Sequence, residues 1–171
     1  MKGMRSKLFF LIIFILINHV SFSQKAKYHG DIIYHLTKHI TWPEKSTAYK
    51  FIIGVVGNDE DFRAFQQLAI EKGEFQGYPI EVRYFACSEE IEECHMLYIS
   101  EKCEVDVNKL IKRTKNDPIL IISGEKGYGE SGSVINFVDS EGKLKFELNQ
   151  QQANKRGLQV SEGLIDLAIL I

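Results

Sequence analysis

The chain has 171 residues, with 21 lysines and arginines against 23 acidic residues, and a formal net charge of -2. This balance gives no reason to expect a nucleic acid as a partner, because nucleic-acid-binding domains usually carry an excess of basic residues. Once an N-terminal targeting segment is set aside, the remaining length fits one domain with a single core.

The first 23 residues have the pattern of a signal peptide. Basic residues lie before an apolar run at 8–17, and the small residues Ser21 and Ser23 follow, as signal peptidase requires. The apolar run is shorter than the roughly 20 residues that span a bilayer, which argues against a membrane anchor. We therefore predict cleavage before Gln24 and a single periplasmic domain at 24–171 that is not embedded in the membrane.

The mature chain alternates amphipathic helices with short apolar strands. In chain order we expect a helix at 25–41, a strand at 51–57, a helix that begins near Asn58 and ends at Gly73, strands at 80–85 and 96–99, a helix at 107–115 and a strand at 119–123. The helices are predicted from apolar residues that recur at helical spacing. Continuous apolar strands that alternate with helices predict a mainly parallel sheet covered on both faces.

The C-terminal part begins with a predicted β-hairpin. Residues 134–138 and 143–148 are strand-like runs joined by four turn-forming residues. Every second residue of the second run is apolar, so one face is expected to be buried and the other polar. Asn136 falls on the same polar face as Lys145 and Glu147.

The chain after the hairpin is expected to turn helical beyond Asn149, to pause at Arg156 and to enter a last helix at Ser161, which is a good N-cap residue. The predicted fold is therefore α/β. It has a mainly parallel sheet of about six strands flanked by helices on both faces, which is a Rossmann/flavodoxin-like three-layer arrangement. It closes with the antiparallel hairpin and the last helix.

The sequence contains few motifs with chemical meaning. His35 and His39 have a spacing that can hold a metal, but they border the apolar stripe of the predicted helix, so surface histidines are the better interpretation. The glycines of 124–132 lead into a strand rather than a helix, which favours a flexible loop over a phosphate-binding loop. No acid/base pair, triad or metal set has a recognisable spacing. We expect no enzyme activity, no metal and no cofactor.

Three cysteines in an exported chain allow one internal disulfide and one remaining thiol. If strands 80–85 and 96–99 are parallel, Cys87 and Cys103 both follow carboxyl ends of strands, and Cys94 lies at the opposite edge of the sheet. This placement favours a Cys87–Cys103 disulfide. The pair Cys87–Cys94 remains open, because the short segment between them would only need to fold back.

Several short motifs run in one order along nearly the whole mature chain. They are Trp42-Pro43, 51–57, 77–82, Cys94-His95 before 97–100, 132–137, 146–149, Ala153, 157–158, Ser161 and 164–168. Together they resemble the YfiR-like family of periplasmic regulators, also called HmsC-like. The chain departs from the family's usual Gly-Gly-Met run, where it has Gly132-Ser133-Val134.

The resemblance implies a non-enzymatic regulator that binds the outer part of an inner-membrane signalling protein. In the family's best-known form that partner is a diguanylate cyclase, and binding limits cyclic-di-GMP signalling and biofilm formation; a sensor kinase is the other partner considered. We expect the contact surface on the polar face of the hairpin and the segment after it, at Asn136, Lys145, Glu147, Asn149 and Arg156. In the alternative, Glu147 and Arg156 form an internal ion pair, and Asn149 caps the following helix.

A second hypothesis is a small-molecule binding module that serves a sensor kinase or a transport system. Ligands of α/β folds usually bind at the carboxyl edge of the sheet. A pocket there would involve Asn58, Gly127, Glu130 and Gly132. The sequence leaves open whether the chain forms a homodimer.

Overall fold

The structure is a computed structural model. It describes residues 29–43, 49–86, 91–101, 103, 106–115 and 117–171. The predicted signal peptide and its cleavage site before Gln24 lie outside these residues.

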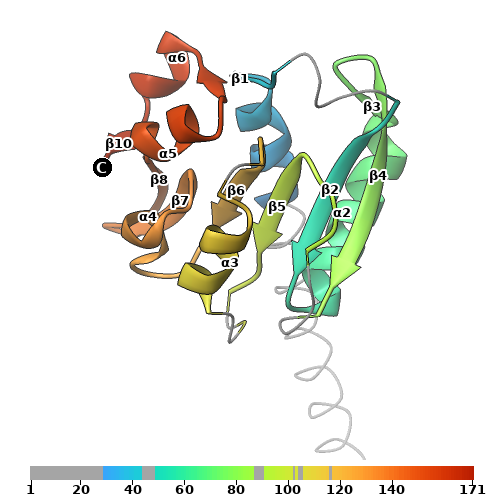
Figure 1. Cartoon of the computed structure of the whole chain (residues 1–171), viewed down its shortest axis with the longest axis horizontal. Helices are drawn as coiled ribbons and strands as arrows, with labels where there is room; N and C mark the ends of the chain where they lie inside the picture. The colour runs from blue at the N-terminus through green and yellow to red at the C-terminus, as the bar shows by residue number, and fades with distance from the viewer. Residues whose placement is uncertain (1–28, 44–48, 87–90, 102, 104–105, 116) are drawn as a thin grey trace, which may run out of the picture.

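The core of the protein is an eight-stranded sheet (Figure 1). From one edge to the other its strands are β10 (Ile169–Leu170), β8 (Lys143–Leu148), β7 (Ile135–Ser140), β6 (Leu120–Ser123), β5 (Met96–Ile99), β2 (Phe51–Val56), β4 (Tyr78–Phe85) and β3 (Glu74–Phe75). The five central strands are parallel to one another: β7, β6, β5, β2 and β4. The pairs β7–β8 and β3–β4 are antiparallel. Strand β10 pairs in parallel with β8.

The expected fold class is therefore wrong. In place of the expected mainly parallel, six-stranded, Rossmann/flavodoxin-like sheet, the protein has a mixed sheet of eight strands, in which parallel central strands are flanked by antiparallel pairs toward both edges. It also has a separate two-stranded antiparallel sheet. The additional strands β3 and β10 have two residues each. Segments this short carry no readable alternation of apolar and polar residues, so their sequence did not reveal them.

The central strands are buried because both faces of the sheet are covered. Every residue of β2, β5 and β6 is buried. On one face, Ile33 of the helical residues 29–37 and Phe65 and Leu68 of α2 (Asp59–Lys72) belong to one apolar cluster. On the other face, α3 (Val107–Arg113) packs against the sheet through a second cluster (Figure 1). Continuous apolar strands are what such two-sided burial requires.

The ends of α2 follow from its sequence, as expected. The Asn58 side chain accepts a hydrogen bond from the Asp61 amide at 2.8 Å and so caps the first turn. Gly73 ends the helix with a positive φ of 74°, and its amide donates to the Ala69 carbonyl. Capping residues at both ends explain why this helix was readable from the sequence.

The first helix ends earlier than predicted. Residues 38–39 form a turn, and Ile40–Thr41 is a strand, β1, that pairs with β9 (Gln159–Val160). The prediction of a helix as far as Thr41 was wrong, because Ile40 is buried by this pairing with a distant segment rather than by a helical stripe. Trp42 then packs in the core, and its indole nitrogen donates to the His95 carbonyl at 3.0 Å.

The predicted hairpin is formed by β7 and β8, but β7 continues to Ser140, so the turn has two residues, Glu141 and Gly142, in place of the four expected. Both turn residues have positive φ, of 57° and 73°, which is the geometry of turns that match the twist of a hairpin. Three short helices pack around it: α4 (Tyr128–Ser131), α5 (Gln150–Lys155) and α6 (Glu162–Ile165). Ser161 caps α6, as expected, since its hydroxyl accepts from the Leu164 amide.

Candidate functional site

The hairpin register places Asn136 opposite Glu147 and Val138 opposite Lys145. Directly paired residues of antiparallel strands lie on the same face of the sheet. Asn136, Lys145 and Glu147 therefore share one face, as the sequence predicts. The three side chains nevertheless have very different environments along that face.

Asn136 is fully buried. Its carbonyl oxygen accepts a hydrogen bond from the Ser123 hydroxyl at 2.7 Å, and its amide nitrogen donates to Glu147 Oε2 at 2.9 Å. The Ser133 hydroxyl lies 2.8 Å from that of Ser123. This chain of polar groups satisfies the buried amide, so the Asn136 side chain is not available to a partner.

Helix α4 covers this end of the polar face. A Cβ atom added at Gly129 would lie 2.6 Å from Glu147 Oε2, 2.7 Å from Ile171 Cδ1 and 3.3 Å from Asn136 Cβ. A side chain at this position would displace the ends of the Glu147 and Ile171 side chains, so glycine allows α4 to lie close to the hairpin. Glu147 consequently remains only partly exposed, and its carboxylate faces inward to Asn136 as well as outward.

The exposed part of the same face lies nearer the hairpin turn and on the edge strand. Lys143 and Lys145 are exposed. Ile169 pairs with Glu147, which places Ile169 and, two residues on, Ile171 on this face. Both isoleucines expose 40% or more of their surface. We call Lys143, Lys145, Ile169 and Ile171 the hairpin patch.

Asn149 acts as the N-cap of α5. Its side-chain oxygen accepts from the Gln152 amide at 3.0 Å, and its amide nitrogen donates to the Gly129 carbonyl at 3.2 Å. The alternative considered for this residue, a capping role, is thus confirmed. The side chain is also partly exposed at the border of the hairpin patch.

Arg156 is buried, with 4% of its surface exposed. Its guanidinium donates to the Thr114 carbonyl at 2.7 Å, to the Asp117 carbonyl at 3.3 Å and to the Thr114 hydroxyl at 3.3 Å. Burial lowers the pKa of the guanidinium, and the nearby Asp117 opposes that shift. Among the described residues it does not pair with Glu147, so the ion pair considered for them is not formed.

The residues expected to line a ligand pocket do not share a described cavity. Asn58 is engaged at the N-terminus of α2, where its amide nitrogen donates to Asp61 Oδ2 at 2.9 Å. Gly127 and Glu130 are exposed on α4. Gly132 is buried, and its Cα faces Ile111 and Gln152. Neither of these two cavities brings the four residues together, and the predicted pocket stays a prediction.

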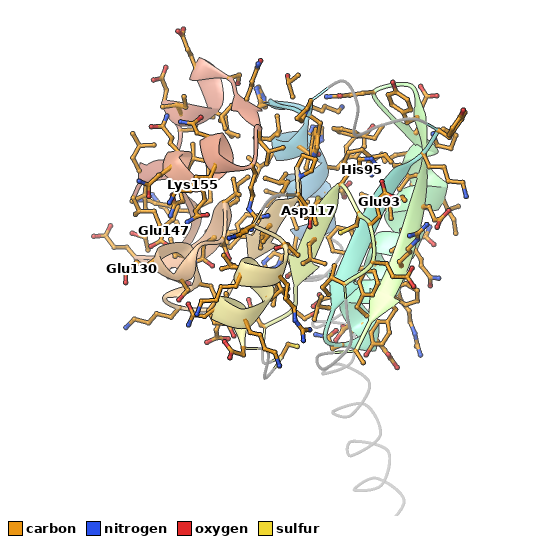
Figure 2. The ribbon with its side chains drawn as sticks, viewed as in Figure 1. Glu93, His95, Asp117, Glu130, Glu147 and Lys155 are labelled. Atoms are coloured by element: carbon orange, nitrogen blue, oxygen red, sulfur yellow. The ribbon has the colours of Figure 1, made fainter. Side chains whose placement is uncertain are left out.

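A cavity of about 490 Å³ lies at the opposite edge of the sheet. It is lined by Pro43, Ile91, Glu92, Glu93, Cys94, His95, Asp117, Pro118 and Ile119. Figure 2 shows Glu93, His95 and Asp117 away from Glu130 and Glu147. The sequence reasoning missed this site because it considered only the carboxyl ends of the strands. The readable signal was the cluster of acidic residues just before β5 and β6, since parallel neighbouring strands begin at one edge.

The cysteines are only partly described. Cys94 is a free, buried thiol, and Cys103 is also buried. Cys87 lies outside the described residues, so the Cys87–Cys103 disulfide stays a prediction. A free Cys94 argues against the alternative pair Cys87–Cys94.

The histidines of the first helix are surface residues, as interpreted from the sequence. Both His35 and His39 are exposed, and His39 Nδ1 lies 3.0 Å from the Ser161 hydroxyl. Within the described ranges, no group of three or more histidine, cysteine or acidic side chains is placed to hold a metal ion.

The comparison with protein families decides the family of the chain. The model of the YfiR/HmsC-like family matches residues 26–169, which is most of the chain. The chain belongs to the YfiR/HmsC-like family. This membership confirms the resemblance found in the sequence motifs and makes the protein one of a family of periplasmic regulators.

Other comparisons give the fold alone. No curated protein matches the chain. Among solved structures, a conserved domain protein from Vibrio cholerae is similar, with a TM-score of 0.57, 14% sequence identity and coverage of 85% of this chain. The chain spans 59% of the length of that protein. At this identity the likeness indicates a shared fold and no shared activity.

Across the part of the chain that the structure describes, no helix has the length and apolar character needed to cross a membrane.

Proposed function

We propose that the protein binds the outer domain of an inner-membrane diguanylate cyclase and holds it inactive, so that cyclic-di-GMP signalling and biofilm formation are limited. The observation that carries this proposal is membership of the YfiR/HmsC-like family over residues 26–169. Removal of the signal peptide before Gln24 is part of the proposal, because the protein must reach the periplasm to meet this partner.

The proposed mechanism is a shift between two states of the partner. A periplasmic protein has no contact with cytoplasmic nucleotides, so it acts only by binding one conformation of a membrane-spanning protein more tightly than another. To move a partner from almost fully active to almost fully inactive, the difference in binding free energy must be about 5.5 kcal/mol. That difference has to come from contacts made in the inactive state alone.

The hairpin patch is the contact surface we propose. It combines two lysines with two exposed isoleucines on one face of β8 and β10. Adjacent basic and apolar side chains suit a partner surface that is both acidic and apolar, since apolar burial supplies affinity and charge complementarity supplies specificity. Glu147 and Asn149 border this patch. Two of the residues expected at the contact surface, Asn136 and Arg156, are buried. They position the hairpin and the segment that follows it.

A double charge reversal tests the patch. Lys143→Glu/Lys145→Glu should fold with an unchanged melting temperature, because both side chains are exposed. It should bind the isolated outer domain of the cyclase at least tenfold more weakly, about 1.4 kcal/mol, by repulsion from an acidic surface. Calorimetry with the purified domain and a biofilm assay in cells give the two readouts.

The matched control is Lys109→Glu/Lys112→Glu on α3, which makes the same change of charge at two other exposed lysines. It should bind and restrain the partner like the parent protein. If the double variant folds normally and binds as tightly as this control, the hairpin patch is not the contact surface. If the parent itself does not bind any cyclase domain encoded near its gene, the proposed function is wrong.

A further inference from the structure

The cavity of about 490 Å³ lies where the chain enters β5 and β6. Its size falls in the range of pockets that hold small molecules, about 300–1,000 Å³. Its lining separates into a buried floor and a more exposed rim. The floor is Cys94, His95 and Ile119, each with 5% or less of its surface exposed.

The floor offers aromatic and uncharged surface. His95 Nδ1 accepts a hydrogen bond from the Ile52 amide at 2.9 Å, which fixes the orientation of the ring. The His95 ring stacks on Phe51 with 5.2 Å between ring centres. Burial raises the pKa of the Cys94 thiol to about 12, which keeps it protonated near neutral pH. The floor therefore suits an apolar or aromatic group.

The rim is negatively charged. Glu92, Glu93 and Asp117 line it, and each is exposed. Glu92 has a cation nearby, since Arg83 Nη1 lies 3.6 Å from its carboxylate. Arg83 contacts Glu93 only at its main-chain carbonyl, at 3.2 Å. The two carboxylates of Glu93 and Asp117 form no ion pair among the described residues.

The buried guanidinium of Arg156 does not reverse this charge at the mouth. It donates to the carbonyl oxygens of Thr114 and Asp117, and its charge also interacts with Asp117 and Cys94. It is not among the lining residues. A cleft with low-dielectric walls and an excess of carboxylates concentrates cations at its mouth.

We propose that this cavity binds a small amphiphilic cation, with an apolar or aromatic body on the floor and an ammonium group between Glu93 and Asp117. An anionic ligand would be repelled by the carboxylates at the rim. A ligand without an apolar part would make no apolar contact with the floor. This site is separate from the hairpin patch and does not depend on the proposed partner.

Trp42 provides a built-in reporter of occupancy. It is the single tryptophan of the chain. Its indole nitrogen donates to the carbonyl of His95, a floor residue, and its neighbour Pro43 lines the cavity. A ligand on the floor is therefore expected to change the tryptophan emission.

The test is a fluorescence titration of the exported protein with three probes of similar shape: 2-phenylethylamine, 2-phenylethanol and phenylacetate. We expect saturable binding of the amine at about millimolar concentration, as for other fragment-sized ligands. The alcohol should bind more weakly, and the anion should not bind. The affinity for the amine should fall as salt is added, because exposed charges are screened. A rise in melting temperature with the amine alone gives an independent readout.

The rim is tested with Glu93→Gln/Asp117→Asn. These changes keep the main-chain carbonyls that accept from Arg83 and Arg156, so the fold should be preserved. The Kd for the amine should rise about two- to tenfold, the range expected for losing two exposed charge contacts. The matched control, Glu130→Gln/Asp166→Asn, removes two exposed carboxylates elsewhere and should bind like the parent. The proposal is overturned if the amine gives no saturable response, if phenylacetate binds equally well, or if both double variants behave alike.

Discussion

Asn136 and Glu147 face each other across the hairpin, and the Asn136 amide nitrogen donates to the Glu147 carboxylate at 2.9 Å. The contact joins a fully buried amide to a partly exposed acid. Glu147 is therefore at once a structural partner of the core and a neighbour of the hairpin patch. Reversing its charge would disturb both roles together, so the exposed lysines are the cleaner probes of partner binding.

We predict that Asn136→Ala lowers the free energy of unfolding by about 1–3 kcal/mol, because it removes the two hydrogen bonds that the buried amide makes with the Ser123 hydroxyl and the Glu147 carboxylate. Urea denaturation followed by Trp42 fluorescence measures the change. Lys145→Ala, on the same face but exposed, is the control and should stay within about 0.5 kcal/mol of the parent. Equal stability of the two variants would show that the buried amide contributes nothing.

The hairpin shows what the sequence can and cannot reveal. Its strands and its polar face were predicted because alternation of apolar and polar residues is local information. The burial of Asn136 was not, because it depends on Ser123 of a neighbouring strand and on the close approach of α4 at Gly129. A polar residue on a polar face is expected to be exposed until such distant contacts are known.

The same limit applies to the edges of the sheet and to the cavity. Strands β3 and β10 exist through pairing with β4 and β8, not through their own two-residue sequences. The cavity brings together three segments, at Pro43, 91–95 and 117–119. By contrast, β2, β5, β6 and α2 were readable, because continuous apolar runs and capping residues are local signals.

Arg156 is the second residue whose role changed from surface contact to structure. We predict that Arg156→Met lowers the free energy of unfolding by about 1–3 kcal/mol. The variant loses the charged hydrogen bonds to the Thr114 and Asp117 carbonyls, each of which keeps one main-chain donor. The relief of a buried charge offsets only part of this cost. Chemical denaturation measures it. The neighbouring, exposed Lys155→Met is the control; if it is as destabilising as Arg156→Met, the buried guanidinium is not important for stability.

Cys94 gives a prediction about reactivity. The thiol is free and buried, and burial raises its pKa to about 12. Only the thiolate is nucleophilic. At pH 8 the native protein should therefore react with a thiol reagent only as fast as it unfolds, and denaturant should release the reaction. Rapid labelling of Cys94 in the native state, located by peptide mass mapping, would contradict this.

The same raised pKa predicts how stability depends on pH. The folded protein holds the Cys94 proton more tightly than the unfolded chain, whose thiol has an ordinary pKa near 9. The contribution of this group to stability is therefore complete below about pH 9 and decreases as the pH rises toward 12, by up to about 1.4 kcal/mol per pH unit.

Other groups also titrate in this range, so the useful quantity is the difference between the parent and Cys94→Ala. We expect this difference in the free energy of unfolding to be constant from pH 6 to pH 8, where the Cys94 thiol is protonated in both the folded and the unfolded protein. It should shrink above about pH 9. Urea denaturation at a series of pH values measures it, and a difference that stays constant up to about pH 11 would show that Cys94 ionises as readily in the folded protein as in the unfolded chain.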